Sequence, residues 1–194
     1  MLLLKLMEKS LKSEKQSLKS DAVSSFLFHD RVVVDTDFSV VQSLHDRGWF
    51  GTVVKQKLEL SLCEALYLLE RGKIVVFDVV KKPLTVTGFI RKARLVDLRF
   101  PTRFKVYSDI RSRGYITKEA LKFGADFSVY ERGTNPQESH SKWLLFAVSS
   151  DDSFNWREFS AMNRVAHSVK KELLVGILDA HADVTYYSIA WQRP

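Results

Sequence analysis

Cysteine is nearly absent from this chain of 194 residues, in which Cys63 is the only one. A single cysteine cannot form an internal disulfide, and it cannot supply the several thiolates of a cysteine-ligated zinc site. Cys63 stands in an apolar stretch with helical spacing, which predicts an ordinary buried thiol. A disulfide-stapled fold and a cysteine-based metal centre are therefore excluded.

Long apolar runs are missing as well. The N-terminal sequence MLLLKLMEKS has a short apolar stretch that charged residues follow at once, unlike a signal peptide. No run approaches the roughly 20 apolar residues that cross a bilayer. These absences predict an intracellular, cytoplasmic protein without a membrane-spanning segment.

The chain also lacks the motifs of several common phosphate-processing enzymes. No glycine-rich phosphate loop precedes a helix, and no H-E-x-x-H sequence occurs. Asp126 and Glu138 come nearest to the carboxylate pattern of a metal-dependent nuclease, but a lysine at the right offset is missing. Nucleotide hydrolysis and two-metal phosphate chemistry are therefore disfavoured, and we expect neither a metal nor a cofactor.

Positive charge, in contrast, is plentiful. Lysine and arginine together outnumber aspartate and glutamate by 30 to 23, which gives a formal net charge of +7. A protein with this balance favours polyanionic partners, with nucleic acid first and an anionic membrane surface second.

The chain begins with a polar arm that precedes an α+β N-terminal domain over residues 29–100. Residues 1–28 are rich in Lys, Ser, Leu and Glu at helix-compatible spacing. They predict either a solvated helix or a basic arm that contacts RNA. Residues 31–44 predict β structure with a turn at Asp35–Asp37.

The clearest helix signal in the first half follows Ser61. Ser61 and Glu64 have the spacing of a capping box, and apolar residues on one face follow them. Gly72 is expected to end this helix. A strand over 73–80 and a second helix over 86–97 complete the predicted domain.

Pro101 marks a boundary after which the pattern changes. The expected elements are a helix over 103–114, two short strands over 115–130, a strand over 141–150, an amphipathic helix over 155–171, an apolar strand over 172–179 and a final strand over 184–192. This order predicts a small α/β domain with a mixed sheet over residues 101–194.

Three residue types in the second half could cleave RNA without a metal. Tyr130 ends a predicted strand, His140 ends a turn-rich loop, and Lys170 and Lys171 follow the amphipathic helix. RNA carries its own nucleophile, the 2′-hydroxyl, so a protein needs a base, an acid and a cation for the charged transition state. Histidine suits the acid because its ordinary pKa is about 6.5, whereas tyrosine, with an ordinary pKa of about 10, is a weak base unless lysines favour the phenolate. Each residue also has a plain structural alternative: a packing tyrosine, an exposed histidine, and lysines that complement a helix dipole.

Several segments resemble the archaeal tRNA-splicing endonuclease family. These are VYSDIRSRGYITKEALKFGADFSVYERG, the SH pair before a strand, NRVAHSVKKELLVGILD, and LSLCEALYLLERGKI in the first half. The resemblance covers residues 31–194 and leaves out the N-terminal thirty. It implies a restriction-endonuclease-like catalytic domain and a lyase-type endoribonuclease. Such an enzyme would cut precursor tRNA at bulge–helix–bulge motifs and leave 2′,3′-cyclic phosphate and 5′-hydroxyl ends without a metal.

The resemblance also implies roles for individual residues. Tyr130 matches the tyrosine that ends GADFxVY, His140 matches the catalytic histidine, and Lys171 matches the lysine counted from His167 in AHSVxK. His167 is the alternative catalytic histidine, or a residue that packs beside the site. Glu172 departs from a position that is often basic in the family, which would weaken the local attraction for phosphate.

A base clamp and an assembly surface follow from the same resemblance. Arg164 matches an arginine that stacks on a bulged base, and Trp191 or else Arg193 is the expected flat partner. Asp179 and Asp183 lie in a turn that would dock into a basic cleft of another subunit, which predicts a homotetramer. The alternative is a non-catalytic RNA-binding or scaffold subunit, although such a subunit would be expected to lose the three catalytic residues.

Overall fold

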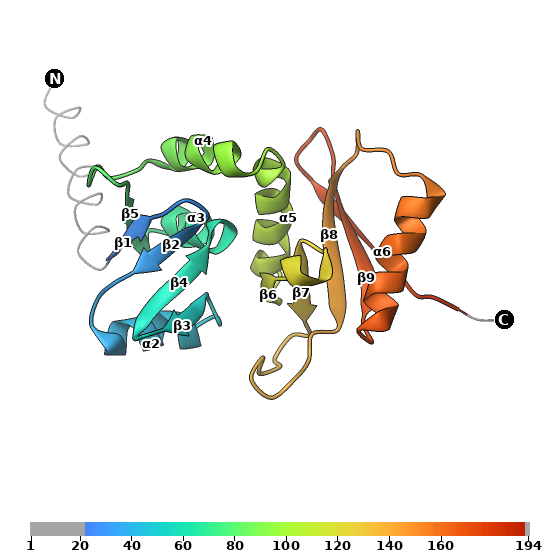
Figure 1. Cartoon of the computed structure of the whole chain (residues 1–194), viewed down its shortest axis with the longest axis horizontal. Coiled ribbons are helices and arrows are strands. Elements are labelled where there is room, and N and C mark those ends of the chain that lie inside the picture. The colour runs from blue at the N-terminus through green and yellow to red at the C-terminus, as the bar shows by residue number, and fades with distance from the viewer. Residues whose placement is uncertain (1–21, 193–194) are drawn as a thin grey trace, which may run out of the picture.

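The computed structural model describes residues 22–192 and places two sheets side by side along the long axis (Figure 1). The first sheet has the order β3-β4-β2-β1-β5, and the second has the order β10-β9-β8-β7-β6. In the described part, no helix is both long and apolar enough to cross a membrane.

The first sheet is built from the N-terminal half of the chain. Its strands are β1 (Val23–Leu27), β2 (Arg31–Val34), β3 (Thr52–Val54), β4 (Lys57–Ser61) and β5 (Ile74–Phe77), and its helices are α2 (Phe38–Asp46), α3 (Leu62–Glu70) and α4 (Val86–Val96). Only the pairing of β1 with β5 is parallel among the strand pairs of this sheet. The first half of the chain contains a mainly antiparallel sheet together with helices, which confirms the predicted α+β class.

Two predictions for this half were wrong. Residues 23–27, taken as the end of a helix-compatible arm, form strand β1 between β2 and β5, where the hydroxyl of Ser25 donates to the carbonyl of Val75 at 3.0 Å. The segment from Phe38 onward forms helix α2 and not a strand, and it buries Val41. In both places tertiary packing outweighed the local pattern. The prediction for residues 1–21 lies outside the described part of the chain.

Helix α3 confirms the capping box that the sequence predicted. The hydroxyl of Ser61 accepts the backbone N–H of Glu64, and the carboxylate of Glu64 accepts the backbone N–H of Ser61. Cys63 is buried in the same helix, as expected. Gly72 ends the turn with a φ of 63°, a conformation that glycine adopts without strain.

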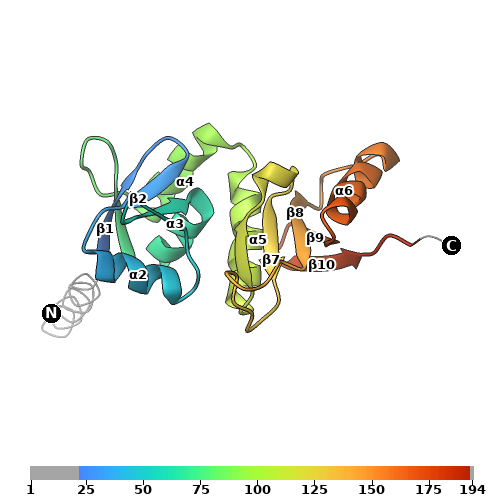
Figure 2. The ribbon, with the colours of Figure 1, turned by 60° about the horizontal axis from the view of Figure 1, so that its bottom comes forward.

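The second sheet carries the remaining elements in the predicted order. They are α5 (Phe100–Ser112), β6 (Ile116–Glu119), the short 3₁₀ helix η1 (Leu121–Phe123), β7 (Phe127–Tyr130), β8 (Trp143–Ser149), α6 (Trp156–Ser168), β9 (Glu172–Leu178) and β10 (Val184–Ile189). The sheet is mixed, as predicted, because β8 and β9 are parallel while the other neighbours are antiparallel. Helices α5 and α6 cover its opposite faces (Figure 2).

Helix α5 joins the two halves. Phe104, Val106, Tyr107 and Ile110 of this helix belong to one buried cluster that also includes residues of both sheets. Pro101 lies in the first turn of α5, so the predicted boundary falls at a helix start. The division into residues 1–28, 29–100 and 101–194 stays a prediction, although β1 belongs to the first sheet.

The turn over residues 48–51 is held directly by the second half of the chain. Lys118 Nζ donates to the carbonyl of Gly51 at 2.6 Å, and Arg111 donates to the carbonyl of Gly48 at 2.7 Å. The buried carboxylate of Glu64 accepts the N–H of Gly51 at 2.8 Å. The bonds from Lys118 and Arg111 connect this turn of the first half to β6 and α5 of the second half.

Candidate active site

The end of β7 and the starts of β8 and β9 meet at one edge of the second sheet. Val129 of β7 lies opposite Trp143 of β8, and Trp143 lies opposite Glu172 of β9. Tyr130 is the last residue of β7, and Lys171 immediately precedes β9. The strand register therefore brings Tyr130, the segment before Trp143 and Lys171 to the same edge.

The loop over residues 131–142 carries His140 to this edge. Its two ends are tied together, because Lys142 donates its N–H to the carbonyl of Val129 at 2.9 Å and pairs with the carboxylate of Glu131 at 2.7 Å. Within the loop, Asn135 bonds to the carboxylate of Glu138 and to a backbone N–H. His140 itself is exposed, so its ring is open to a substrate.

Lys171 reaches directly to the base of that loop. Lys170 has a φ of 56°, and the chain turns there between the end of α6 and the start of β9. Lys171 Nζ then donates to the carbonyl oxygen of Ser141 at 2.7 Å, next to His140. Partial burial lowers the pKa of Lys171, and the positive charge of Lys122 lowers it further.

Tyr130 is half-buried beside the loop. Burial raises the pKa of its phenol, because the charged phenolate loses solvation there. The sequence hypothesis required lysines that favour the phenolate, whereas the shift found for Tyr130 comes from burial and goes in the opposite direction. A raised pKa makes the phenolate a smaller fraction near neutral pH than it is for an exposed tyrosine.

Glu172 points its carboxylate away from Lys171. This carboxylate accepts hydrogen bonds from Trp143 Nε1 and from the hydroxyl of Ser188, both at 3.0 Å. Successive side chains of a strand point to opposite faces, so Glu172 points away from the face that Lys171 uses. Its negative charge still acts at this end of the sheet, because the pKa of Lys142 is raised by the hydrogen bond to Glu131 and also by the charge of Glu172. That Glu172 weakens the local attraction for phosphate stays a prediction.

The proposed base clamp lies along α6 and the chain after β10. Arg164 is exposed on α6. Trp191, 49% exposed, has its ring 4.6 Å from the ring of His167, measured between centroids. This contact agrees with one of the two alternatives given for His167, a residue that packs beside the site. Residues three apart on a helix are neighbours, so Arg164 lies beside His167 and near Trp191. Arg193 lies outside the described residues.

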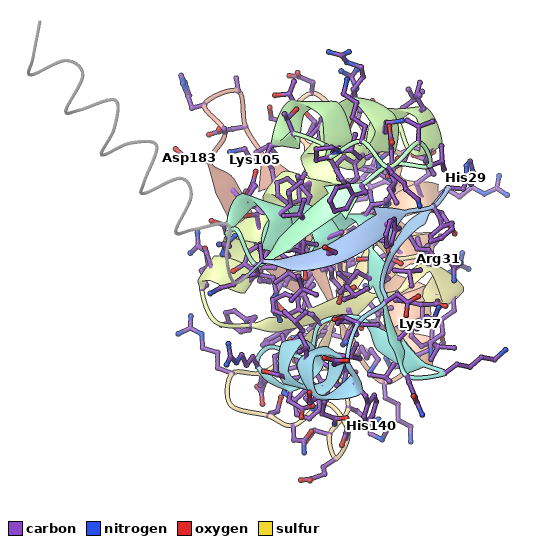
Figure 3. All side chains as sticks on the ribbon, turned by 90° about the vertical axis from the view of Figure 1, so that its left-hand side faces the viewer. His29, Arg31, Lys57, Lys105, His140 and Asp183 are labelled. Carbon is purple, nitrogen blue, oxygen red and sulfur yellow. The ribbon has the colours of Figure 1, made fainter. Side chains whose placement is uncertain are left out.

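The two aspartates of the C-terminal turn differ in what they do. One carboxylate oxygen of Asp179 accepts the backbone N–H groups of His181 and Asp183, both at 2.9 Å, so Asp179 organises the turn itself. Asp183 is exposed and follows the end of β9, so it lies at the edge of the second sheet opposite to the loop of His140 (Figure 3). Within one chain this turn therefore contributes nothing to the candidate active site.

Lys122 is a cation near Lys171 that sequence reasoning missed. It belongs to η1, its ammonium group lies 4.9 Å from the ring centroid of Phe123, and its charge acts on Lys171. The available signal was a lysine in the turn before the strand that carries Tyr130. Its nearness to Lys171, however, follows only from the fold.

No metal-ligand cluster accompanies these residues. Across residues 22–192, no three His, Cys, Asp or Glu side chains are grouped so that they could hold a metal ion. The functional groups that this edge offers include a phenol, an imidazole and the ammonium group of Lys171. Such groups can transfer protons and bind a phosphate.

Two family models match the chain. The model described as the N-terminal domain of tRNA intron endonuclease matches residues 23–90. The model described as the catalytic C-terminal domain of tRNA intron endonuclease matches residues 100–186. The second match includes Tyr130, His140, Arg164 and Lys171.

Proteins named tRNA-splicing endonuclease are similar over most of the chain. The protein from Thermococcus kodakarensis is 43% identical over 168 residues, which cover 87% of this chain and 97% of that protein. The protein from Nanoarchaeum equitans is 42% identical over 152 residues, or 75% and 97% of the two chains. The protein from Methanothermobacter thermautotrophicus is 39% identical over 165 residues, or 85% and 95%.

Proposed function

This chain belongs to the tRNA intron endonuclease family, and from that premise we propose that it excises introns from precursor tRNA. The proposed substrate is a bulge–helix–bulge RNA, which a protein recognises by shape and by its unpaired bases. The proposed products carry a 2′,3′-cyclic phosphate and a 5′-hydroxyl, as in a metal-independent, lyase-type endoribonuclease.

One contact carries the proposal. The hydrogen bond from Lys171 Nζ to the carbonyl of Ser141 joins the start of β9 to the loop of His140. Tyr130 ends β7, which is separated from β9 by β8 alone, and this arrangement at one edge of the sheet supports a phosphate site that all three side chains share. An ammonium group has three donors, which leaves Lys171 able to bind phosphate oxygen while it keeps the loop contact.

The reaction balances with these groups alone. The 2′-oxygen attacks phosphorus and gives its proton to the base, for which the phenolate form of Tyr130 is the candidate; Tyr130 is then a neutral phenol. The bond from phosphorus to the 5′-oxygen breaks, and His140 donates the proton that this oxygen needs. Lys171 stabilises the added negative charge on the non-bridging oxygens, where Lys122 adds a second positive charge.

Assembly and location belong to the same proposal. We propose a homotetramer of this chain, with the exposed Asp183 at a contact between subunits, and a cytoplasmic enzyme without a membrane partner. The mixed sheet with helices on both faces is compatible with a restriction-endonuclease-like catalytic domain. In the proposed clamp, Arg164 and Trp191 would hold a bulged base, with Arg193 as the alternative partner.

A single experiment separates this proposal from a non-catalytic RNA-binding or scaffold subunit. The purified chain alone is incubated with a bulge–helix–bulge RNA in EDTA, and the new ends are mapped. Cleavage with a cyclic phosphate on the 5′ fragment supports the proposal. A strict magnesium requirement or a 3′-hydroxyl end overturns the mechanism, and binding without cleavage supports a scaffold.

A further inference from the structure

A large aromatic side chain is exposed at the start of α6, far from the candidate active site. Trp156 is the first residue of the helix and is 83% exposed. Its ring meets the ring of Phe159 edge-on, at 6.0 Å between centroids, and Phe159 packs into the core beneath α6. The indole is therefore supported on one side while much of its surface remains open to solvent.

Helical geometry aligns Trp156 with the region of the base clamp. Trp156 and His167 are 11 residues apart, close to three turns, so they lie on one line about 16 Å apart along the helix. Trp191 packs on His167. Arg157 and Arg164, both exposed, lie two turns apart on a neighbouring line. We call Trp156, Arg157, Arg164 and Trp191 the α6 surface. The chain after β10 runs past α6, as Figure 1 shows.

The chemistry of the α6 surface favours a nucleic-acid strand. The indole of Trp156 offers an exposed flat face for stacking, and the guanidinium groups of Arg157 and Arg164 offer donors to phosphates. Glu158 is the only acid among the residues of α6, and its carboxylate is used in the capping box with Asn155. Proteins that bind single-stranded RNA commonly combine positively charged side chains with exposed aromatic side chains.

We propose that the α6 surface is an extended RNA-binding site, in which Trp156 stacks on a base of a strand that flanks the cleavage site. This inference rests on the proposed function, because it requires that the substrate is RNA. Trp156 lies about 18 Å along α6 from Ser168, after which the chain turns to Lys171, so it is too far to touch the nucleotide that is cut. Its contact is therefore with a flanking strand, beyond the bulged base that Arg164 would hold.

The test measures binding to two uncleavable RNAs. Both carry 2′-deoxy nucleotides at the cleavage sites, which removes the nucleophile. One has long single-stranded flanks, and the other ends close to the bulges. Trp156→Ala should weaken binding of the long RNA about 5- to 100-fold, the range expected when one stacked base is lost, and leave binding of the short RNA unchanged. Trp156→Phe should retain most of the affinity.

Two further variants sharpen the result. Arg157→Gln should weaken binding of the long RNA and make its affinity less dependent on salt, because one phosphate contact is lost. Leu95→Ala is the matched control: Leu95 is 85% exposed on α4, so it removes exposed apolar surface away from α6. It should change binding of neither RNA. Thermal unfolding of each variant confirms that the fold is retained.

The outcomes distinguish the two levels of the proposal. If the wild-type chain binds neither RNA, the proposed function itself is wrong. If the wild type binds both and Trp156→Ala matches it on the long RNA, the α6 surface is not an RNA site. An equal loss on both RNAs, or a change in oligomeric state without a change in RNA affinity, also overturns the inference. The latter result would identify Trp156 as a subunit contact.

Discussion

The ammonium group of Lys171 donates a hydrogen bond to the backbone carbonyl oxygen of Ser141, 2.7 Å away. The two residues are 30 positions apart in the chain, yet this bond joins the turn after α6 to the residue that follows His140. The cation of the proposed reaction is thus bonded to the residue next to the proposed acid. Loss of Lys171 would therefore remove a positive charge and one of the hydrogen bonds that hold the loop, while the bonds of Lys142 to Val129 and Glu131 remain.

His140→Ala should slow cleavage by about 10²- to 10⁴-fold, the range of a lost general acid, because the 5′-oxygen would leave without a proton. RNA affinity should stay nearly unchanged, since His140 is exposed and lies on a loop whose ends are held by other residues. Single-turnover cleavage and a binding assay measure the two effects. His167→Ala is the control: normal cleavage by His140→Ala together with slow cleavage by His167→Ala would reverse the assignment.

Lys122→Met should raise the pKa of Lys171. Burial and the charge of Lys122 lower this pKa, so the cationic form of Lys171 is present at low pH and is lost early as pH rises. Removing the charge of Lys122 should therefore keep Lys171 cationic to higher pH. An NMR titration of the Lys171 side chain measures the shift directly, and an unchanged titration would contradict the prediction. Lys105→Met, which removes an exposed lysine of α5, should leave the titration of Lys171 unchanged.

Asp183→Lys should divide the proposed tetramer into dimers and abolish cleavage. Asp183 is exposed, whereas the carboxylate of Asp179 accepts hydrogen bonds that shape the turn. The charge of Asp183 can therefore be reversed without disturbing the turn, and the charge of Asp179 cannot. Removing one partner of a buried charge pair can cost about 2–5 kcal/mol of binding free energy. Light scattering reports the assembly. A variant that remains tetrameric and active would show that Asp183 does not hold subunits together.

Gly51→Ala should lower the free energy of unfolding by more than Gly72→Ala does. Both glycines have a φ of 63°, so each substitution has a similar backbone cost of about 1–2 kcal/mol. A Cβ on Gly51 would lie 2.4 Å from the carbonyl oxygen of Glu59, whereas a Cβ on Gly72 would meet nothing within 4 Å. The clash should add about 1–3 kcal/mol. Denaturant unfolding compares the variants, and equal losses would contradict the prediction.

Local sequence signals predicted the helices best. The capping box of Ser61 and Glu64 and the apolar face of α6 depend on residues within a few turns of one another, and both appear in the structure. Strand β1 was missed because its pairing partners β2 and β5 decide it, and its serines hide that pairing. Helix α2 was missed because adjacent valines favour a strand where packing around Val41 requires a helix.

The residue types of the candidate site, and the family that they indicate, were determined by the sequence itself. Tyr130, His140 and Lys171 stand in recognisable segments, and the net positive charge favours RNA. Only the tertiary structure decided that Lys171 contacts Ser141, that Lys122 acts on Lys171, and that Glu172 points to the other face of the sheet. The physical reason is strand register: a shift by one residue would turn every side chain to the opposite face, and long-range pairing alone sets that register.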